Sequence, residues 1–168
     1  VFSCIRRDAS GGFVVCVVHM TPVVREAYRI GVFPWLNEDQ PILWWSPDPR
    51  AVIYPERLHV SRSLARTLKR CGWQRTINKD FGAVIKGCAT ERGRFGTWIT
   101  PTMIAAYREL HRLGYAHSVE IWQGEELAGG IYGIRLGNKF FGESMFTRIT
   151  DGSKVALSAL ADLCLHEG

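Results

Sequence analysis

This sequence lacks the cysteine pairs that disulfide frameworks and zinc sites require. Its five cysteines are odd in number, scattered, and never spaced as Cys-x-x-Cys; they are Cys4, Cys16, Cys71, Cys88 and Cys164. Both kinds of site need regularly spaced pairs, and the five histidines show no ligand spacing either. We therefore predict no metal and a reducing cytoplasm as the compartment.

Long apolar runs and nucleotide-binding glycine loops are also missing. The longest apolar run covers residues 13–18, far short of the roughly 20 residues that span a bilayer, and no signal-peptide pattern precedes it. The sequence contains neither a Gly-x-x-x-x-Gly-Lys loop nor a Gly-x-Gly-x-x-Gly fingerprint. We expect no membrane anchor, no dinucleotide cofactor and no use of ATP, so any bond the protein forms needs a donor that is already activated.

The rest of the composition is that of a folded protein. With 168 residues, 46% of them hydrophobic, the chain can build one core, or one core and a small flanking module. Caps and periodicity predict strands over 13–18, 58–60, 75–78, 116–122, 127–136 and 139–146, helices over 21–31, 61–71, 81–89, 100–114 and 153–166, and a proline- and tryptophan-rich loop over 31–50. This order predicts the α+β class, with helices on one mixed or antiparallel sheet. We place a small N-terminal domain over 1–56 and a larger domain over 57–168.

Glu143 interrupts a segment that otherwise reads as a buried strand. Gly137 and Asn138 predict a tight hairpin turn between two strands, and an unpaired carboxylate in such a sheet would cost several kcal/mol. A ligand amine would satisfy this carboxylate. A purely structural salt bridge to Arg135 or Arg148 would satisfy it equally well.

Aromatic residues surround this glutamate in the predicted fold. Gly142 predicts a β-bulge, through which Phe140 and Glu143 can share a face of the sheet. A carboxylate beside an aromatic wall suits an apolar side chain that carries an ammonium group. The loop over 31–50 adds three tryptophans, Trp35, Trp44 and Trp45. They either form the core of a small N-terminal module or line the bottom of a binding pocket.

A cationic face is predicted on the helix over residues 61–71. Four basic residues recur at helical spacing, opposite Leu64 and Leu68; they are Arg62, Arg66, Lys69 and Arg70. Clustered arginines without matching acids favour phosphates, although a solvated surface can show the same pattern. Because no duplex-reading helix is recognisable, contact with the backbone and a single-stranded end of a nucleic acid is expected.

Four motifs follow one another along the chain. They are Gly-Val-Phe-Pro-Trp at 31–35, Leu-Trp-Trp-Ser-Pro-Asp-Pro-Arg at 43–50, Gly-Thr-Trp-Ile-Thr at 96–100 and Gly-Glu-Ser-Met-Phe at 142–146. In these motifs the sequence resembles the leucyl/phenylalanyl-tRNA–protein transferase family, and the resemblance runs from about Thr21 to the end of the chain. The first twenty residues match less well.

The resemblance implies a fold and an activity. The fold would be a small N-terminal domain followed by an acetyltransferase-like (GNAT-like) mixed sheet flanked by helices. The enzyme would move Leu or Phe, and Met less well, from aminoacyl-tRNA to proteins beginning with Lys or Arg, which creates an N-terminal degradation signal of the N-degron pathway. No cofactor is implied, and we expect a monomer. The family continues beyond position 168 with an acidic residue and a glutamine thought to assist proton transfer, so we expect the chain to be C-terminally incomplete.

The resemblance also assigns residues by position. The aminoacyl pocket would consist of Trp35, Trp98, Ile131, Phe140, Glu143 and Ser144, with Glu143 as the catalytic residue. Tyr107 and Arg62 would act around the 3′ end of the tRNA. The other members of the cationic face, Arg66, Lys69 and Arg70, are candidates for tRNA binding from their helical spacing alone. Glu143 would hold an ammonium group, either the α-amine of the donor or the basic N-terminal residue of the acceptor.

Two other functions stay open. The first is a coenzyme-A-dependent N-acyltransferase of the same general fold, which needs a glycine-rich pyrophosphate turn after the bulged strand; residues 146–153 lack this turn. The second is a catalytically incomplete tRNA-binding fragment.

Overall fold

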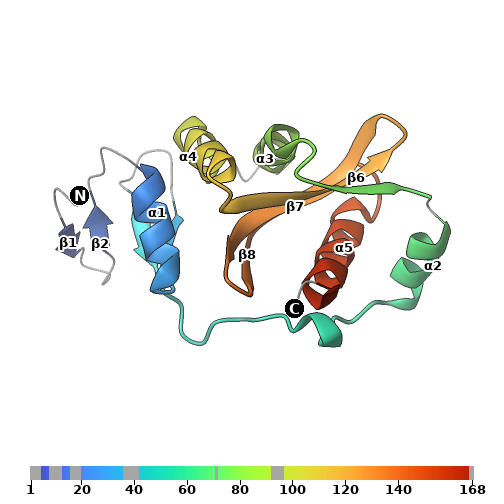
Figure 1. Ribbon diagram of the computed structural model, residues 1–168, viewed down its shortest axis with the longest axis horizontal. Helices are drawn as coiled ribbons and strands as arrows, with labels where there is room; N and C mark the ends of the chain where they lie inside the picture. The colour runs from blue at the N-terminus through green and yellow to red at the C-terminus, as the bar shows by residue number, and fades with distance from the viewer. Residues whose placement is uncertain are drawn as a thin grey trace.

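The computed structural model describes residues 5–7, 13–15, 20–35, 42–70, 72–91 and 97–166 (Figure 1). Its elements in chain order are β1 (Ile5–Arg7), β2 (Phe13–Val15), α1 (Met20–Arg29), β3 (Phe33–Trp35), β4 (Leu43–Trp45), the 3-10 turn η1 (Pro55–Arg57), α2 (Arg62–Arg70), β5 (Gln74–Ile77), α3 (Phe81–Thr90), α4 (Pro101–Arg112), β6 (Ala116–Gln123), β7 (Glu126–Leu136), β8 (Lys139–Thr147) and α5 (Gly152–His166). Within these ranges, no helix is both long enough and apolar enough to cross a bilayer.

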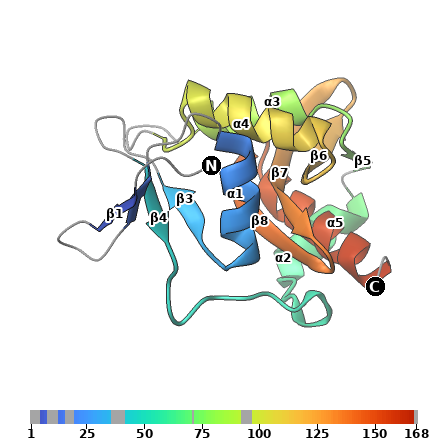
Figure 2. The same cartoon turned by 60° about the vertical axis from the view of Figure 1, so that its left-hand side comes forward.

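The strands form two antiparallel sheets. The small N-terminal sheet has the order β1-β2-β4-β3 and the larger sheet the order β5-β6-β7-β8. Helices α3 and α4 cover one face of the larger sheet and α5 covers the other (Figure 1). Helix α1 lies beside β8, with the small sheet on its outer side (Figure 2). The α+β class and the small N-terminal domain are confirmed.

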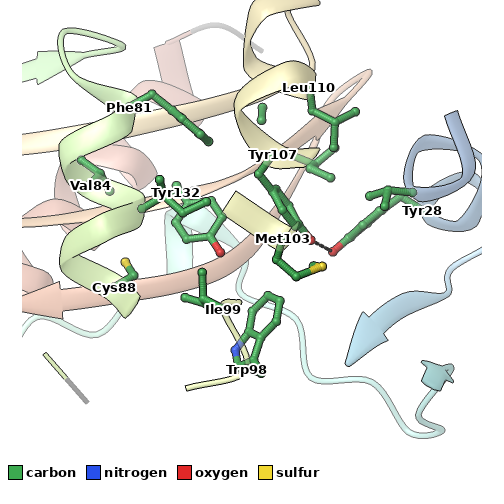
Figure 3. Packing of buried hydrophobic residues seen from close by; sticks show 14 of the residues in the cluster. Tyr28, Phe81, Val84, Cys88, Trp98, Ile99, Met103, Tyr107, Leu110 and Tyr132 are labelled. Atoms are coloured by element: carbon green, nitrogen blue, oxygen red, sulfur yellow. Dashed lines mark hydrogen bonds between the residues drawn. The ribbon is translucent and has the colours of Figure 1, made fainter. Parts of the chain in front are cut away.

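Two hydrophobic cores fill the larger sheet's two faces. The first core lies under α1, α3 and α4 and includes Tyr28, Phe81, Met103 and Tyr132 (Figure 3). The second core lies under α5 and α2 and includes Leu64, Val119, Ile131, Val155 and Ala159. Because successive strand residues point to opposite faces, the core to which a residue belongs tells which face it occupies.

Side-chain caps explain the starts of two predicted helices, α3 and α4. The Asp80 carboxylate accepts a hydrogen bond from the backbone N–H of Ala83 at 2.7 Å and begins α3. The Thr100 hydroxyl accepts one from the N–H of Met103 at 3.4 Å, with Pro101 at the first position of α4. Each cap satisfies a backbone donor that the helix itself leaves open.

Two predictions about strands were wrong. Residues 58–60 form no strand; they follow η1 as irregular backbone without a strand partner. The predicted loop over 31–50 contains β3 and β4. Pro34 is compatible with a strand there because β3 lies at the edge of its sheet, where a missing backbone N–H breaks no ladder. Of the strand predicted over 13–18, the structure contains Phe13–Val15, and residues 16–18 lie outside the described ranges.

The β7–β8 hairpin carries the predicted turn and the predicted bulge. Gly137 has φ of +60° in the two-residue turn. Ser144 pairs with Tyr132, whereas the next pair is Gly133 with Gly142, so Glu143 is the extra residue of a bulge. A bulge turns two successive residues toward one side of the sheet, and this turns Glu143 toward the first core.

Candidate active site

The Glu143 carboxylate is held by two tyrosine hydroxyls. Tyr28 Oη, from α1, donates to Oε1 at 2.5 Å, and Tyr107 Oη, from α4, donates to Oε2 at 2.9 Å. The two hydroxyls lie 3.0 Å apart and point toward one another (Figure 3). Three segments that are distant in the sequence therefore meet at one carboxylate.

The proton affinity of this carboxylate is unusual. Burial is the largest influence and raises the pKa of Glu143 to about 7, while the hydrogen bonds from Tyr28 and Tyr107 and the positive charge of Arg50 partly oppose this rise. Burial, followed by the nearby charge of Glu143, raises the pKa of both tyrosines well above the usual range. The tyrosines thus stay protonated as donors, and Glu143 titrates near neutral pH.

No arginine of the described chain forms an ion pair with Glu143. Arg148 pairs with Glu91 at 3.1 Å, and Arg135 Nε donates to the carbonyl oxygen of Gly137 at 3.3 Å. The structural salt bridge to Arg135 or Arg148, which the sequence left open, is therefore wrong. A buried carboxylate that forms no ion pair with any described residue is a candidate functional group.

Arg50 is the positive charge that influences Glu143 from a distance. Its Nη1 donates to the carbonyl oxygen of Gly31 at 3.1 Å. Its guanidinium lies over the rings of Phe33, at 5.0 Å from the centroid, and Phe141, at 5.7 Å. These contacts hold the cation near the carboxylate without neutralising it.

Two of the predicted pocket tryptophans are brought together. The rings of Trp35 and Trp98 stack with centroids 5.7 Å apart and planes at 20°. The Trp98 ring meets the Tyr107 ring edge to face at 6.5 Å, which connects the indole pair to Glu143. Trp98 is 7% exposed and Trp35 41% exposed, so the pair forms a wall with one open side.

Ser144 is also on the Glu143 side of the sheet, but Phe140 and Ile131 are not. Ser144 is buried opposite Tyr132, a residue of the first core. Phe140 pairs with Arg135, one position away from the pair of Phe141 with Ile134, which faces the first core. Ile131 belongs to the second core.

The expectation that Phe140 shares a face with Glu143 was therefore wrong. The extra residue of the bulge comes after Gly142, so side chains still alternate between the two faces from Phe141 to Glu143. Phe141 and Glu143 therefore face the same core. The Tyr28 and Phe141 rings meet edge to face at 5.2 Å, which places Phe141 beside the tyrosine that binds Glu143.

The cationic face lies far from Glu143. Arg62, Arg66, Lys69 and Arg70 are all exposed on α2, at the opposite end of the molecule from α1 (Figure 1). A hollow on α2 is lined by Arg66 and Arg70 together with Ser63 and Thr67. Tyr107 is fully buried beside Glu143, so it belongs to the carboxylate cluster and not to the α2 surface.

Nothing in the described ranges suggests a metal centre. No three His, Cys, Asp or Glu side chains of those ranges gather closely enough to hold an ion.

Family models match nearly the whole of the described chain. The model of the leucyl/phenylalanyl-tRNA protein transferase matches residues 52–168, and that of the N-terminal domain of the same transferase matches residues 21–48. The chain belongs to the leucyl/phenylalanyl-tRNA protein transferase family. The resemblance in the four sequence motifs is thereby confirmed.

Curated relatives with this name are similar over most of the chain. The protein of Idiomarina loihiensis is 58% identical over 143 residues, which is 84% of this chain and 61% of the relative. That of Chromohalobacter salexigens is 57% identical over 152 residues, 89% of this chain and 59% of the relative. That of Escherichia coli O1:K1 is 52% identical over 142 residues, 84% and 60% respectively. The chain spans about 60% of the length of these relatives.

Sequence reasoning did not single out Tyr28 or assign Arg50 a role. Tyr28 is 115 positions from Glu143 and sits in an amphipathic helix, where a tyrosine is an ordinary core residue. Arg50 was visible within the motif over 43–50, but only the folded chain places its guanidinium near Glu143.

Proposed function

We propose that the protein to which this chain belongs is an aminoacyltransferase that moves Leu or Phe, and Met less well, from aminoacyl-tRNA to proteins with an N-terminal Lys or Arg. The observation that carries the proposal is the Glu143 carboxylate, oriented by two neutral donors beside stacked indoles, in a chain of this family. We assign residues 57–168 to an acetyltransferase-like domain and 1–56 to the N-terminal domain. The protein would act as a monomer in the cytoplasm, where aminoacyl-tRNA is made.

The reaction needs orientation more than activation. The α-amine nitrogen of the acceptor attacks the carbonyl carbon of the aminoacyl ester, a C–N bond forms, and the C–O bond to the ribose breaks. The proton lost by the amine ends on the ribose oxygen. Because the ester is already activated, positioning and proton transfer supply most of the catalysis, and no cofactor is required.

Glu143 would bind the ammonium group of one substrate. Its two oxygens already accept hydrogen bonds from Tyr28 and Tyr107 and keep further lone pairs. A cation within contact distance favours the ionised carboxylate. The arriving ammonium would therefore displace the remaining proton from Glu143, and the charges would pair in a site that burial makes poor in water.

The indole wall would hold the aminoacyl side chain. Trp35 and Trp98 present flat apolar surface next to Tyr107, which suits Leu or Phe better than a side chain branched at Cβ. Shape selection of this kind is worth roughly 10- to 100-fold. The placement of Ile131 and Phe140 on the other face does not support their assignment to this pocket, and it stays a prediction.

The cationic residues of α2 would hold the phosphates of the tRNA. Arg62, Arg66, Lys69 and Arg70 are exposed, and the Ser63 hydroxyl beside them can donate to a phosphate oxygen. The neighbouring Thr67 hydroxyl already donates to Asp151 Oδ2 at 3.1 Å. An RNA bound there and reaching Glu143 would extend along the molecule. Tyr107 would act at its aminoacylated 3′ end.

Removing two of these arginines should weaken tRNA binding and its salt dependence together. Each phosphate contact contributes close to one unit to the slope of log K against log salt. For Arg62→Ala with Arg66→Ala we expect the slope to fall by about two and affinity at low salt to fall about tenfold or more. Filter binding across a salt series measures both quantities.

The matched control removes the same charge elsewhere. Arg29 and Arg112 are exposed on α1 and α4 and already pair with Glu26 and Glu109. Arg29→Ala with Arg112→Ala should leave the slope nearly unchanged. Equal slopes for both double variants would show that the α2 face does not bind tRNA phosphates.

The proposed activity is tested by transfer of radiolabelled leucine from Leu-tRNA to a peptide beginning with Arg. We expect transfer to the free peptide, none to the same peptide acetylated at its N-terminus, and about 10- to 100-fold slower transfer by Glu143→Gln, because a charge-assisted hydrogen bond is lost. Transfer from acetyl-coenzyme A instead would indicate an N-acyltransferase. Binding of tRNA without transfer would identify this chain as an incomplete tRNA-binding fragment.

A further inference from the structure

We propose that Tyr28 is a positioning residue for Glu143, so that the N-terminal helix α1 completes a site whose carboxylate lies on the larger sheet. The contact itself does not depend on the proposed function. The inference rests on the proposed function only for the reaction that Glu143 serves.

Burial and three contacts place the Tyr28 side chain. Its ring is 2% exposed and meets Phe141 edge to face at 5.2 Å. Its hydroxyl lies 2.5 Å from Glu143 Oε1 and 3.0 Å from Tyr107 Oη. The ring therefore has little freedom to turn, and the hydroxyl has a defined position on one side of the carboxylate.

The two tyrosines together fix the plane of the carboxylate. Tyr28 holds Oε1 and Tyr107 holds Oε2, so rotation of the carboxylate about its last bond would break one of the two hydrogen bonds. A single donor could not prevent that rotation. Orientation of the charged group thus needs α1 as well as α4.

A neutral donor at position 28 also preserves the charge of Glu143. A lysine or arginine in this position would pair with the carboxylate and compete with a ligand ammonium. A tyrosine hydroxyl stabilises the ionised form by hydrogen bonding but leaves the net negative charge in place. This combination of orientation and retained charge is what a site for a cationic ligand requires.

The groups that face Glu143 come from several elements. They are Tyr28 on α1, Tyr107 on α4, and Arg50 after β4. The Tyr132 hydroxyl group on β7 acts on the two tyrosines and raises their pKa. Of these, the two hydrogen-bonding tyrosines lower the pKa of Glu143 most directly, against the effect of burial. Removing the Tyr28 hydroxyl should therefore make Glu143 harder to ionise.

Tyr115 offers a matched control. Its hydroxyl accepts a hydrogen bond from Arg25 Nη1 at 3.1 Å, and the Arg25 guanidinium lies 5.5 Å from the centre of its ring. Tyr115→Phe, like Tyr28→Phe, removes one hydroxyl that links α1 to the rest of the protein. The Glu143 hydrogen bonds come from Tyr28 and Tyr107 and do not involve Tyr115.

The test is a carbon-13 NMR titration of the Glu143 carboxyl group in the chain labelled at glutamate, with the signal assigned through Glu143→Gln. In Tyr28→Phe we expect the pKa to move from about 7 to about 8, because a hydrogen bond to a charged group is worth at least one pKa step. Tyr115→Phe should leave it unchanged. Site-specific 3-fluorotyrosine at position 28 is a stronger donor and should move it below 7, an opposite change that unfolding could not produce.

The same variants are then assayed for leucine transfer between pH 6 and pH 9. If Glu143 acts ionised, Tyr28→Phe should be about fivefold slower at pH 7 and should recover at pH 9, whereas Tyr115→Phe should follow the unchanged protein. An unaltered Glu143 pKa in both position-28 variants overturns the proposal. Normal titration shifts without transfer by the unchanged protein would instead contradict the proposed function and leave the positioning role standing.

Discussion

Between about pH 5 and pH 9, the unchanged protein should lose about 2.5 kcal/mol of unfolding free energy relative to the Glu143→Gln variant. The pKa of Glu143 is raised from 4.5 in its ordinary state to about 7 in the fold. Within that window the folded chain binds more protons than the unfolded chain, so its stability falls as pH rises and levels off above pH 8. Glutamine keeps the shape of the side chain but does not titrate. Urea unfolding of both proteins at several pH values measures the difference.

The control for this experiment is a carboxylate of ordinary surroundings. Glu109 is exposed and paired with Arg112, which lowers its pKa. A lowered pKa acts in the opposite sense: it adds stability that is lost only as the pH falls below the ordinary range. Glu109→Gln should therefore run parallel to the unchanged protein from neutral to alkaline pH. If Glu143→Gln did the same, Glu143 would already be ionised in the fold at pH 5.

Replacing Gly133 with alanine should destabilise the fold by about 3 kcal/mol, or prevent it from forming. A Cβ at this position would lie 2.1 Å from the backbone carbonyl oxygen of Phe141 and 2.5 Å from the Phe140 ring. The backbone atom belongs to the neighbouring strand β8, directly before the bulge, so it can give way only if the strand pairing shifts. Thermal and urea unfolding of Gly133→Ala measure the loss.

Gly142 provides the control because it pairs with Gly133 across the two strands. Among the described residues, a Cβ at Gly142 would meet only the Cδ1 atom of Ile131, at 3.8 Å, which is ordinary van der Waals contact. Gly142→Ala should change the stability by about 1 kcal/mol or less. Equal losses in the two variants would mean that the cost comes from losing a glycine near the bulge and not from the close approach of the β8 backbone.

The local patterns of the chain predicted most of its elements. The hairpin turn at Gly137 and the bulge at Glu143 are both present, and two of the predicted helices, α3 and α4, begin where side-chain caps satisfy their first N–H groups. These features depend on neighbouring residues, which is why they can be read from sequence. The strand predicted at 58–60 failed because extended backbone becomes a strand only when a partner lies beside it, and none does there.

The sequence by itself determined that Glu143 is anomalous, that a cationic stripe lies on one helix and that the motifs are those of one transferase family. Only the tertiary structure decided what surrounds the carboxylate. Tyr28 comes to it across 115 positions, and Phe141 rather than Phe140 shares its face, because strand register and the docking of α1 are set by packing between distant segments. Such contacts leave no local pattern, since the same tyrosine in an isolated helix would simply be a core residue.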